Sequence, residues 1–229
     1  MSFRVLRASE RIYSPKLVQD RKILPVSPNS YNLGLKRALD IFLVMVAAVP
    51  ALLIVALLAV LIACDGKSPF FSQQRVGRNG RLFRMWKLRS MMVGAEAQLE
   101  TCLAACPQRR REWNESQKLR HDPRITRIGH LIRKTSMDEL PQLWNVFRGD
   151  MSIVGPRPML PSQRAIYPGT AYYAMRPGIT GYWQVSARND SSFADRARFD
   201  ASYLREMSLI TDLKVMICTV RVVLTGTGC

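Results

Sequence analysis

The chain has 229 residues, enough to bury one good core, which favours a single domain with appendages over two full domains. It carries 34 Lys and Arg against 17 Asp and Glu, a net charge of +17 that suits nucleic acid, phospholipid head groups or a phosphorylated substrate without choosing among them. Its five cysteines are odd in number and scattered, and this argues against a disulfide framework and against a cysteine metal site.

The first part of the chain combines basic side chains with several prolines and shows no sustained hydrophobic period. This composition predicts a flexible basic tail over residues 1–34, lying near an anionic membrane surface. We expect no chemistry from this tail.

Between Ile41 and Cys64 the chain reads IFLVMVAAVPALLIVALLAVLIAC, without a charged residue. At about 1.5 Å per residue, a helix of this length reaches across a hydrocarbon core of about 30 Å. A cleavable signal peptide does not fit, because the segment begins far from the N-terminus and lacks a small-x-small cleavage pattern. The segment is therefore expected to meet lipid.

The charges beside this segment and the proline inside it predict its path. The residues before it carry a net charge of +5 and those after it +12, so both ends favour the cytoplasmic side. Pro50 lies near the middle, where its missing N–H and its ring bend a helix. Residues 35–64 are therefore predicted to form a kinked re-entrant membrane helix hairpin, with a single straight span as the alternative.

Residues 65–229 are predicted to form one small domain of α+β class, mostly helical. Asn79-Gly80 lies between two short runs of mixed apolar and basic residues, a pattern typical of a β-hairpin turn. Residues 93–118 are rich in helix formers and are interrupted at Pro107. A further, mostly apolar helix is predicted over residues 208–224, and its composition suits burial in a membrane interface.

Two amphipathic helices are predicted in the middle of this domain. Residues 124–134 place isoleucines and leucines on one face and basic residues on the others, so the helix either packs on the core or lies among lipid head groups. Residues 138–148 repeat the apolar spacing, with Asp138 at the predicted N-terminus and Pro141 in the first turn. These helices, together with residues 208–224, are the expected interfacial helices.

Asp138 and Glu139 are adjacent carboxylates at this predicted N-terminus, where backbone N–H groups and the helix dipole also favour phosphate. In an arbitrary soluble protein, such a pair is more often an ordinary acidic first turn. Downstream, however, GDMSIVGPRP frames Arg157 between two prolines, which presents a guanidinium suited to bidentate phosphate binding. A second framed arginine, Arg176, opens the glycine-containing stretch RPGITGYWQVSARND.

These segments occur in an order that resembles the bacterial sugar transferase family, the small monotopic phosphoglycosyl transferases. The resemblance covers residues 36–224, and within the family it is strongest to the undecaprenyl-phosphate galactose phosphotransferases of the ExoY type. It rests on KRALD before the apolar segment, Pro50 within it, WKLRSM at residues 86–91, DPRITRIGHLIRKTSMDELPQLWNVFRGDMSIVGPRP at residues 122–158 and RPGITGYWQVSARND at residues 176–190. The chain departs from the family at Arg89, where a lysine is frequent.

The resemblance implies that Asp138 is a nucleophile that attacks the β-phosphorus of a UDP-sugar, releases UMP and carries the phosphosugar to undecaprenyl phosphate. It implies that Asp138 and Glu139 hold one Mg²⁺. The residues expected to contact phosphate or substrate are Lys87, Arg89, Arg133, Arg157 and Arg176. Galactose is the expected sugar and glucose the second choice, and the reaction would be the first membrane step of exopolysaccharide synthesis.

The resemblance also implies a place in the cell and a set of partners. The chain is expected in the bacterial inner membrane, with its catalytic domain facing the cytoplasm and its basic surface on phospholipid. Nucleic acid is not an expected partner, and a homo-oligomer stays open. The alternative is a basic membrane-anchored protein that binds anionic lipid or nucleic acid without catalysis, which explains the charge but not the paired carboxylates. Another nucleotide-sugar transferase fits less well, because D-x-D and P-loop motifs are absent.

Overall fold

The structure is a computed structural model that describes residues 31–116, 119, 121–186 and 192–224. Most of the predicted tail therefore lies outside the described residues. In chain order the elements are η3 (Tyr31–Leu35), α1 (Lys36–Ala63), β1 (Phe70–Val76), η4 (Arg78–Gly80), β2 (Leu82–Leu88), α2 (Leu99–Ala104), α3 (Pro107–Ser116), α4 (Arg127–Lys134), η5 (Met137–Glu139), α5 (Gln142–Arg148), β3 (Ser152–Val154), η6 (Pro161–Ile166), α6 (Ala171–Ala174), β4 (Gly178–Thr180), α7 (Tyr182–Ser186), α8 (Arg196–Glu206) and α9 (Leu209–Leu224). The described part is mostly helical with two small sheets, in agreement with the predicted α+β class.

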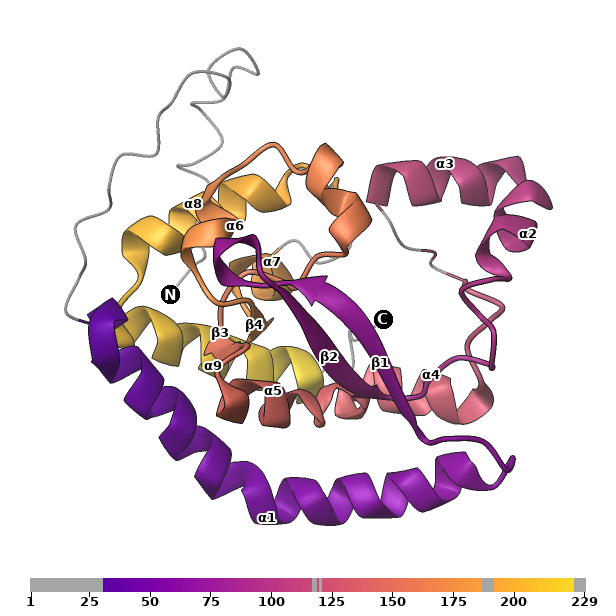
Figure 1. The fold of residues 1–229 in the computed structure, drawn as a ribbon, viewed down its shortest axis with the longest axis horizontal. Helices are drawn as coiled ribbons and strands as arrows, with labels where there is room; N and C mark the ends of the chain where they lie inside the picture. The colour runs from indigo at the N-terminus through magenta and orange to yellow at the C-terminus, as the bar shows by residue number, and fades with distance from the viewer. Residues whose placement is uncertain (1–30, 117–118, 120, 187–191, 225–229) are drawn as a thin grey trace.

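Figure 1 shows the long helix α1 along one side of the molecule, with α4 and α5 beside it. The β1–β2 ribbon crosses the middle, and α6, α2 and α3 lie on the side away from α1. The end of α8 contacts the start of α1 through Tyr203 and Lys36. The catalytic candidates Asp138 and Glu139 are in η5, between α4 and α5. This turn therefore lies between the long apolar helix and the rest of the domain.

The helix α1 is continuous over 28 residues, contains Pro50, and bends near its middle (Figure 1), as the sequence predicts. By length and composition it is the one helix of the described residues that could cross a membrane. Most of its apolar side chains are exposed, whereas Val44, Leu58 and Ile62 form a narrow buried stripe against the domain. The helix therefore contacts the domain along one edge and leaves a wide apolar face free.

Polar contacts fix the first turns of α1 to β3 and to α9. The buried Asp40 carboxylate accepts hydrogen bonds from Ser152 Oγ (3.0 Å) and from the Ile153 N–H (2.9 Å) in β3. Lys36 Nζ lies 2.5 Å from Asp212 Oδ2 in α9. The KRALD segment thus joins the apolar helix firmly to the domain, because breaking these contacts would leave the buried charges of Asp40 and Asp212 unpaired.

The predicted β-hairpin is confirmed. β1 and β2 pair in antiparallel register from Phe70 opposite Leu88 to Val76 opposite Leu82. The turn needs positive φ angles, which Asn79 (57°) and Gly80 (75°) supply. Side chains alternate along each strand, and cross-strand partners share a face.

The helices predicted between residues 93 and 148 are confirmed in part. The long segment is interrupted at Pro107, where α3 begins, although residues 93–98 precede α2 as turns. The prediction that an α-helix starts at Asp138 is wrong, because α5 starts at Gln142. Ser136 in the left-handed region breaks the chain direction, and Pro141 has no N–H to continue an α-helical ladder from the preceding turn.

Several helices present large apolar side chains to the outside. In α4 the buried Ile132 contacts the core, while Leu131 on the same helix is 63% exposed. The other exposed apolar side chains of α4, α5 and α9 are Ile128, Trp144, Phe147, Leu209, Ile210, Leu213, Ile217 and Val220. With the exposed face of α1 they form far more apolar surface than single scattered residues would, and this suits contact with lipid.

Candidate active site

A tight turn places the two carboxylates. Ser136 adopts φ 57° and ψ 18°, and its carbonyl accepts the Glu139 N–H at 3.2 Å. A serine in this region costs on the order of 1–3 kcal/mol, so surrounding contacts must hold the turn. As a result Asp138 is buried, with 5% of its surface exposed, and Glu139 lies next to it.

Lys87 is the cation closest to this pair. Its Nζ lies 2.6 Å from Glu139 Oε1 and 3.6 Å from Asp138 Oδ2. Lys87 is the second-last residue of strand β2 and pairs with Phe71 in β1. The hairpin therefore delivers a positive charge to both carboxylates, where the sequence expects it.

Arg157 and Arg133 surround the pair from two other elements. Arg157 Nη2 lies 3.6 Å from Glu139 Oε1. Arg133, in the last turn of α4, is close enough for its charge to act on Asp138, and burial lowers the pKa of its guanidinium. The structure thus brings three of the five predicted phosphate-binding cations to the carboxylates.

The environment of Asp138 sets two opposing electrostatic effects against each other. Burial raises the pKa of the Asp138 carboxyl, the charge of Lys87 lowers it, and that of Glu139 raises it again. Arg133 and Arg157 favour the anion. The net result is a raised pKa, and the cations oppose it by favouring the ionised, poorly hydrated form that suits a nucleophile.

Three glycines hold the loop that carries Arg157. A Cβ added at Gly155 would lie 2.4 Å from the Arg176 carbonyl oxygen, and one at Gly178 would lie 2.1 Å from the Gly155 nitrogen. One at Gly181 would lie 2.1 Å from the Gly155 carbonyl oxygen. Only glycine permits this close backbone approach. The contact between the ends of the parallel strands β3 and β4 therefore fixes where the Pro156-Arg157-Pro158 segment begins.

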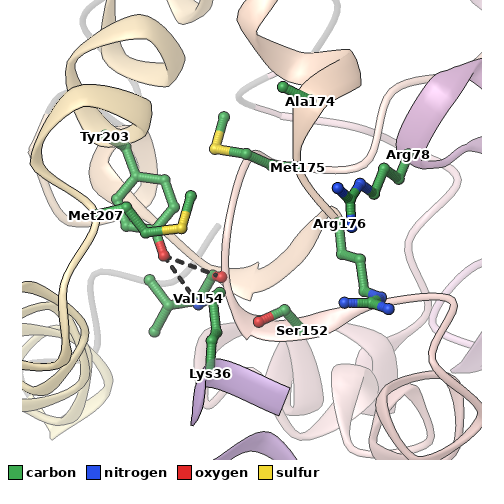
Figure 2. A pocket seen from close by; sticks show the side chains of 9 residues that line it. All are labelled: Lys36, Arg78, Ser152, Val154, Ala174, Met175, Arg176, Tyr203 and Met207. Atoms are coloured by element: carbon green, nitrogen blue, oxygen red, sulfur yellow. Dashed lines mark hydrogen bonds between the residues drawn. The ribbon is translucent and has the colours of Figure 1, made fainter. Parts of the chain in front are cut away.

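Arg89 and Arg176 contact groups other than the carboxylate pair. Arg89 donates from Nη1 and Nη2 to the two carboxylate oxygens of Asp65, each at 2.6 Å, and also to the Ile62 carbonyl. Arg176 donates from Nε to the Gly149 carbonyl at 3.0 Å. Figure 2 shows it beside a cavity of about 10 Å³, room for about one water molecule. Their roles toward substrate remain predictions.

A larger cavity of about 270 Å³ adjoins the carboxylates. Glu139 and Arg157 contribute to its wall together with side chains from α5, β4, α7 and α9. The other lining residues are Thr135, Ser136, Leu140, Leu143, Ile179, Thr180, Gln184, Val185, Thr219, Val222 and Val223. A mostly apolar cavity with charged groups in its wall is suited to a ligand that has both kinds of surface.

Two further arginines near the site were missed by the sequence reasoning. Arg75 in β1 is on the same hairpin face as Lys87. Phe71 pairs with Lys87, and Arg75 lies four residues further along the strand, so its side chain points to the same face. Arg196, the first residue of α8, stacks on the Trp183 ring with its guanidinium carbon 4.2 Å from the centroid. Strand alternation could have indicated Arg75, whereas no local signal indicates Arg196.

The carboxylate pair fits a magnesium ion that substrate phosphates help to hold. No group of three or more His, Cys, Asp or Glu side chains gathers among the described residues. Magnesium, however, is usually bound by one or two carboxylates plus phosphate oxygens and water. Asp138 and Glu139 supply two adjacent carboxylates, and the donor would supply the rest.

Sequence comparisons relate the chain to a known protein family. A sequence model of the family described as "Bacterial sugar transferase" matches residues 31–226. The UDP-galactose-lipid carrier transferase of Erwinia amylovora is 47% identical over 199 residues, which are 85% of this chain and 41% of that protein. The undecaprenyl-phosphate galactose phosphotransferase of Salmonella typhimurium is 43% identical over 196 residues, again 85% of this chain and 41% of that protein.

A relative of similar length also matches. The exopolysaccharide production protein ExoY of Rhizobium meliloti is 41% identical over 199 residues, which are 84% of this chain and 87% of that protein. The family match covers α1, the η5 turn with both carboxylates, the Arg157 loop and all of α9. The chain belongs to the bacterial sugar transferase family, a family of transferase enzymes.

Proposed function

We propose that this chain transfers a sugar 1-phosphate from a UDP-sugar to undecaprenyl phosphate and releases UMP. The observation that carries the proposal is the buried Asp138 in a strained turn, with Glu139 beside it and Lys87 and Arg157 in contact with the pair. Cations on both sides of a carboxylate suit a reaction between two phosphorylated substrates. Relatives named for galactose-lipid transfer support the same substrate classes.

The proposed reaction has two displacement steps. In the first, a carboxylate oxygen of Asp138 bonds to the β-phosphorus, and the bond from that phosphorus to the bridging oxygen of the UDP-sugar breaks, so that UMP leaves with the bond electrons. In the second, a phosphate oxygen of the lipid bonds to the same phosphorus and Asp138 is released as a carboxylate. Each step conserves charge and atoms and needs no external oxidant or reductant.

Lys87, Arg133 and Arg157 are proposed to neutralise the phosphate oxygens as they approach a negatively charged pair. Without them, repulsion between Asp138 and the diphosphate would raise the barrier to attack. A bound Mg²⁺ would add charge neutralisation at the diphosphate, held by Asp138 and Glu139. Because Lys87 contacts both carboxylates, it also favours the ionised form of Asp138.

We propose that α1 enters and leaves the membrane by the cytoplasmic face of the bacterial inner membrane. The bend in α1 and the excess of positive charge on both sides of its apolar segment support this path. The exposed apolar side chains of α4, α5 and α9 would then rest in the same interface. In this arrangement a lipid phosphate and a soluble nucleotide sugar reach one site.

The test of this function is release of UMP by the full chain in detergent or lipid nanodiscs. We expect repeated release of UMP only when a UDP-sugar, polyprenyl phosphate and Mg²⁺ are all present. In a panel of donors, UDP-galactose should be preferred over UDP-glucose. Ping-pong kinetics are expected from two separate displacements. Salt-sensitive nucleic-acid binding with no UMP from any donor would instead identify a basic binding protein.

A further inference from the structure

Three buried side-chain polar atoms of the described residues have no hydrogen-bond partner, and they belong to Arg75, Gln184 and Arg196. Arg196 stacks on the ring of Trp183, the residue before Gln184. Arg157, which contacts Glu139, also lies over the Trp183 ring, at 5.9 Å. Buried polar groups are rarely left unsatisfied, so such a cluster beside a catalytic pair indicates a ligand site.

Arg196 is the most informative member. Its side chain is held between two aromatic rings, 4.2 Å from the Trp183 centroid and 4.6 Å from the Phe193 centroid, and 7% of the residue is exposed. Its Nε has no partner among the described residues. The carboxylate that acts on it, Asp200, has its own pKa raised to about 7 by burial and accepts a hydrogen bond from Tyr167 at 2.6 Å. Asp200 is therefore a poor counter-ion.

Arg75 is held in place by neutral groups. Its Nη1 donates to the Pro158 carbonyl at 3.1 Å and its Nη2 to Gln73 Oε1 at 2.6 Å, while Nε is buried without a partner. Burial, and then the charge of Arg157, lowers its pKa to about 10. Arg157 and Arg75 lower the pKa of Arg196 in the same way. Beyond the effect of burial, the charge of Arg157 thus lowers the pKa of both Arg75 and Arg196.

The local charge balance requires an anion. The Glu139 carboxylate contacts Arg157, but Lys87 already lies 2.6 Å from the same carboxylate oxygen. Bringing a buried cation, Arg196, together with two partly buried ones, Arg75 and Arg157, is unfavourable unless a bound anion neutralises them. Planar guanidinium groups are also the preferred partners of phosphate oxygens.

We infer that Arg75 and Arg196 complete, with Arg157, a three-arginine site that binds the phosphate of the nucleotide end of the donor. This inference rests on the proposed function, since it names the group that leaves when Asp138 attacks. Arg196 and Arg75 are binding residues here and take no part in the covalent steps.

The position of the cluster favours the nucleotide over the lipid as the source of this phosphate. Arg196 is the first residue of α8, and α8 has no exposed large apolar side chain, although its far end contacts the start of α1 through Tyr203 and Lys36. The exposed apolar side chains belong mainly to α1, α4, α5 and α9. A water-soluble nucleotide reaches the α8 side directly, whereas a lipid phosphate remains at the apolar side.

The test compares Arg196→Met with wild type in thermal unfolding of the full chain in detergent, with and without UDP. Met keeps most of the stacked volume and removes the charge. We expect the unliganded variant to unfold at the same temperature as wild type or higher, since an uncompensated buried charge is lost. UDP should raise the unfolding temperature of wild type but not that of the variant. UDP affinity should fall at least about tenfold, the effect of losing a charged hydrogen bond.

Arg198→Met, on the same helix but half-exposed and 3.7 Å from Asp195, is the matched control and should keep the full UDP response. A short-chain prenyl phosphate tests whether the site binds the lipid phosphate instead of the nucleotide phosphate. Any rise in unfolding temperature that it causes in wild type should also occur in Arg196→Met. The inference is overturned if UDP stabilises Arg196→Met as much as wild type, if the variant fails to fold, or if only the prenyl phosphate response is lost. Because unfolding needs no turnover, a failed UMP-release assay is a separate result.

Discussion

Lys87 Nζ lies 2.6 Å from Glu139 Oε1, and this contact joins the β-hairpin to the η5 turn. Neither residue is fully exposed, so the pair is shielded from solvent more than a surface ion pair would be. The contact holds the turn in which Asp138 is buried. It also makes Lys87 the residue through which the ionisation of Asp138 is tuned.

Replacing Lys87 by Met should slow the first displacement about 100-fold, the usual scale for losing one preorganised charge at a reacting group. It should also move the acid limb of the pH–rate profile to higher pH. Burial raises the pKa of Asp138 and Lys87 lowers it, so removing the lysine raises that pKa further and leaves the nucleophile protonated at higher pH. Burst-phase UMP release measured across pH gives both quantities.

Lys87→Arg is the control for this prediction, since it keeps the charge, and its acid limb should stay close to that of wild type. An acid limb that does not move in Lys87→Met would mean that another group limits the reaction at low pH.

Replacing Gly155 by Ala should destabilise the fold by about 3 kcal/mol and abolish turnover, because the added methyl group would meet the Arg176 carbonyl at 2.4 Å. The Arg157 loop would have to move away from Glu139 to relieve the contact. Thermal unfolding and UMP release measure the two effects. Gly34→Ala is the matched control, since a Cβ there meets nothing within 4 Å. Wild-type stability in Gly155→Ala would contradict the role given to the close backbone contacts of Gly155.

Replacing Pro50 by Ala should straighten α1 and let part of the population cross the membrane, because the missing hydrogen bond and ring clash are removed. The measurement is labelling of the N-terminal tail from either side of sealed membranes. Tails of the wild type should be reachable only from the cytoplasmic side, and some tails of the variant from outside. Val49→Ala, an exposed neighbour in the helix, should behave as wild type. A wild-type tail reachable only from outside would refute the re-entrant path.

The elements that the sequence predicts correctly have local causes. Asn79-Gly80 supplies the positive φ angles of the hairpin turn, and Pro107 marks the start of α3. The error at the start of α5 is also informative. The apolar spacing of residues 138–148 is helical, but the left-handed Ser136 makes η5 a separate turn, and such a strained serine has no sequence signal.

The site could be predicted only where a motif carries its own geometry. The Asp138-Glu139 pair and the proline-framed Arg157 were expected, and the structure brings them together. Arg89 was expected beside them, but it pairs with Asp65, which reaches it only because β2 ends beside the end of α1. Arg196 depends in the same way on how α8 packs against α7, so only the folded chain shows it.

The central claim is that Asp138 becomes covalently bonded to phosphorus during turnover. The most direct measurement is intact-protein and peptide mass analysis after mixing the full chain with UDP-galactose and Mg²⁺ in the absence of lipid acceptor. We predict a mass increase of one phosphosugar located on Asp138, discharged on addition of polyprenyl phosphate and missing from Asp138→Asn. An adduct of undiminished yield on Asp138→Asn, or UMP release by the wild type with no adduct at any time, would contradict the account.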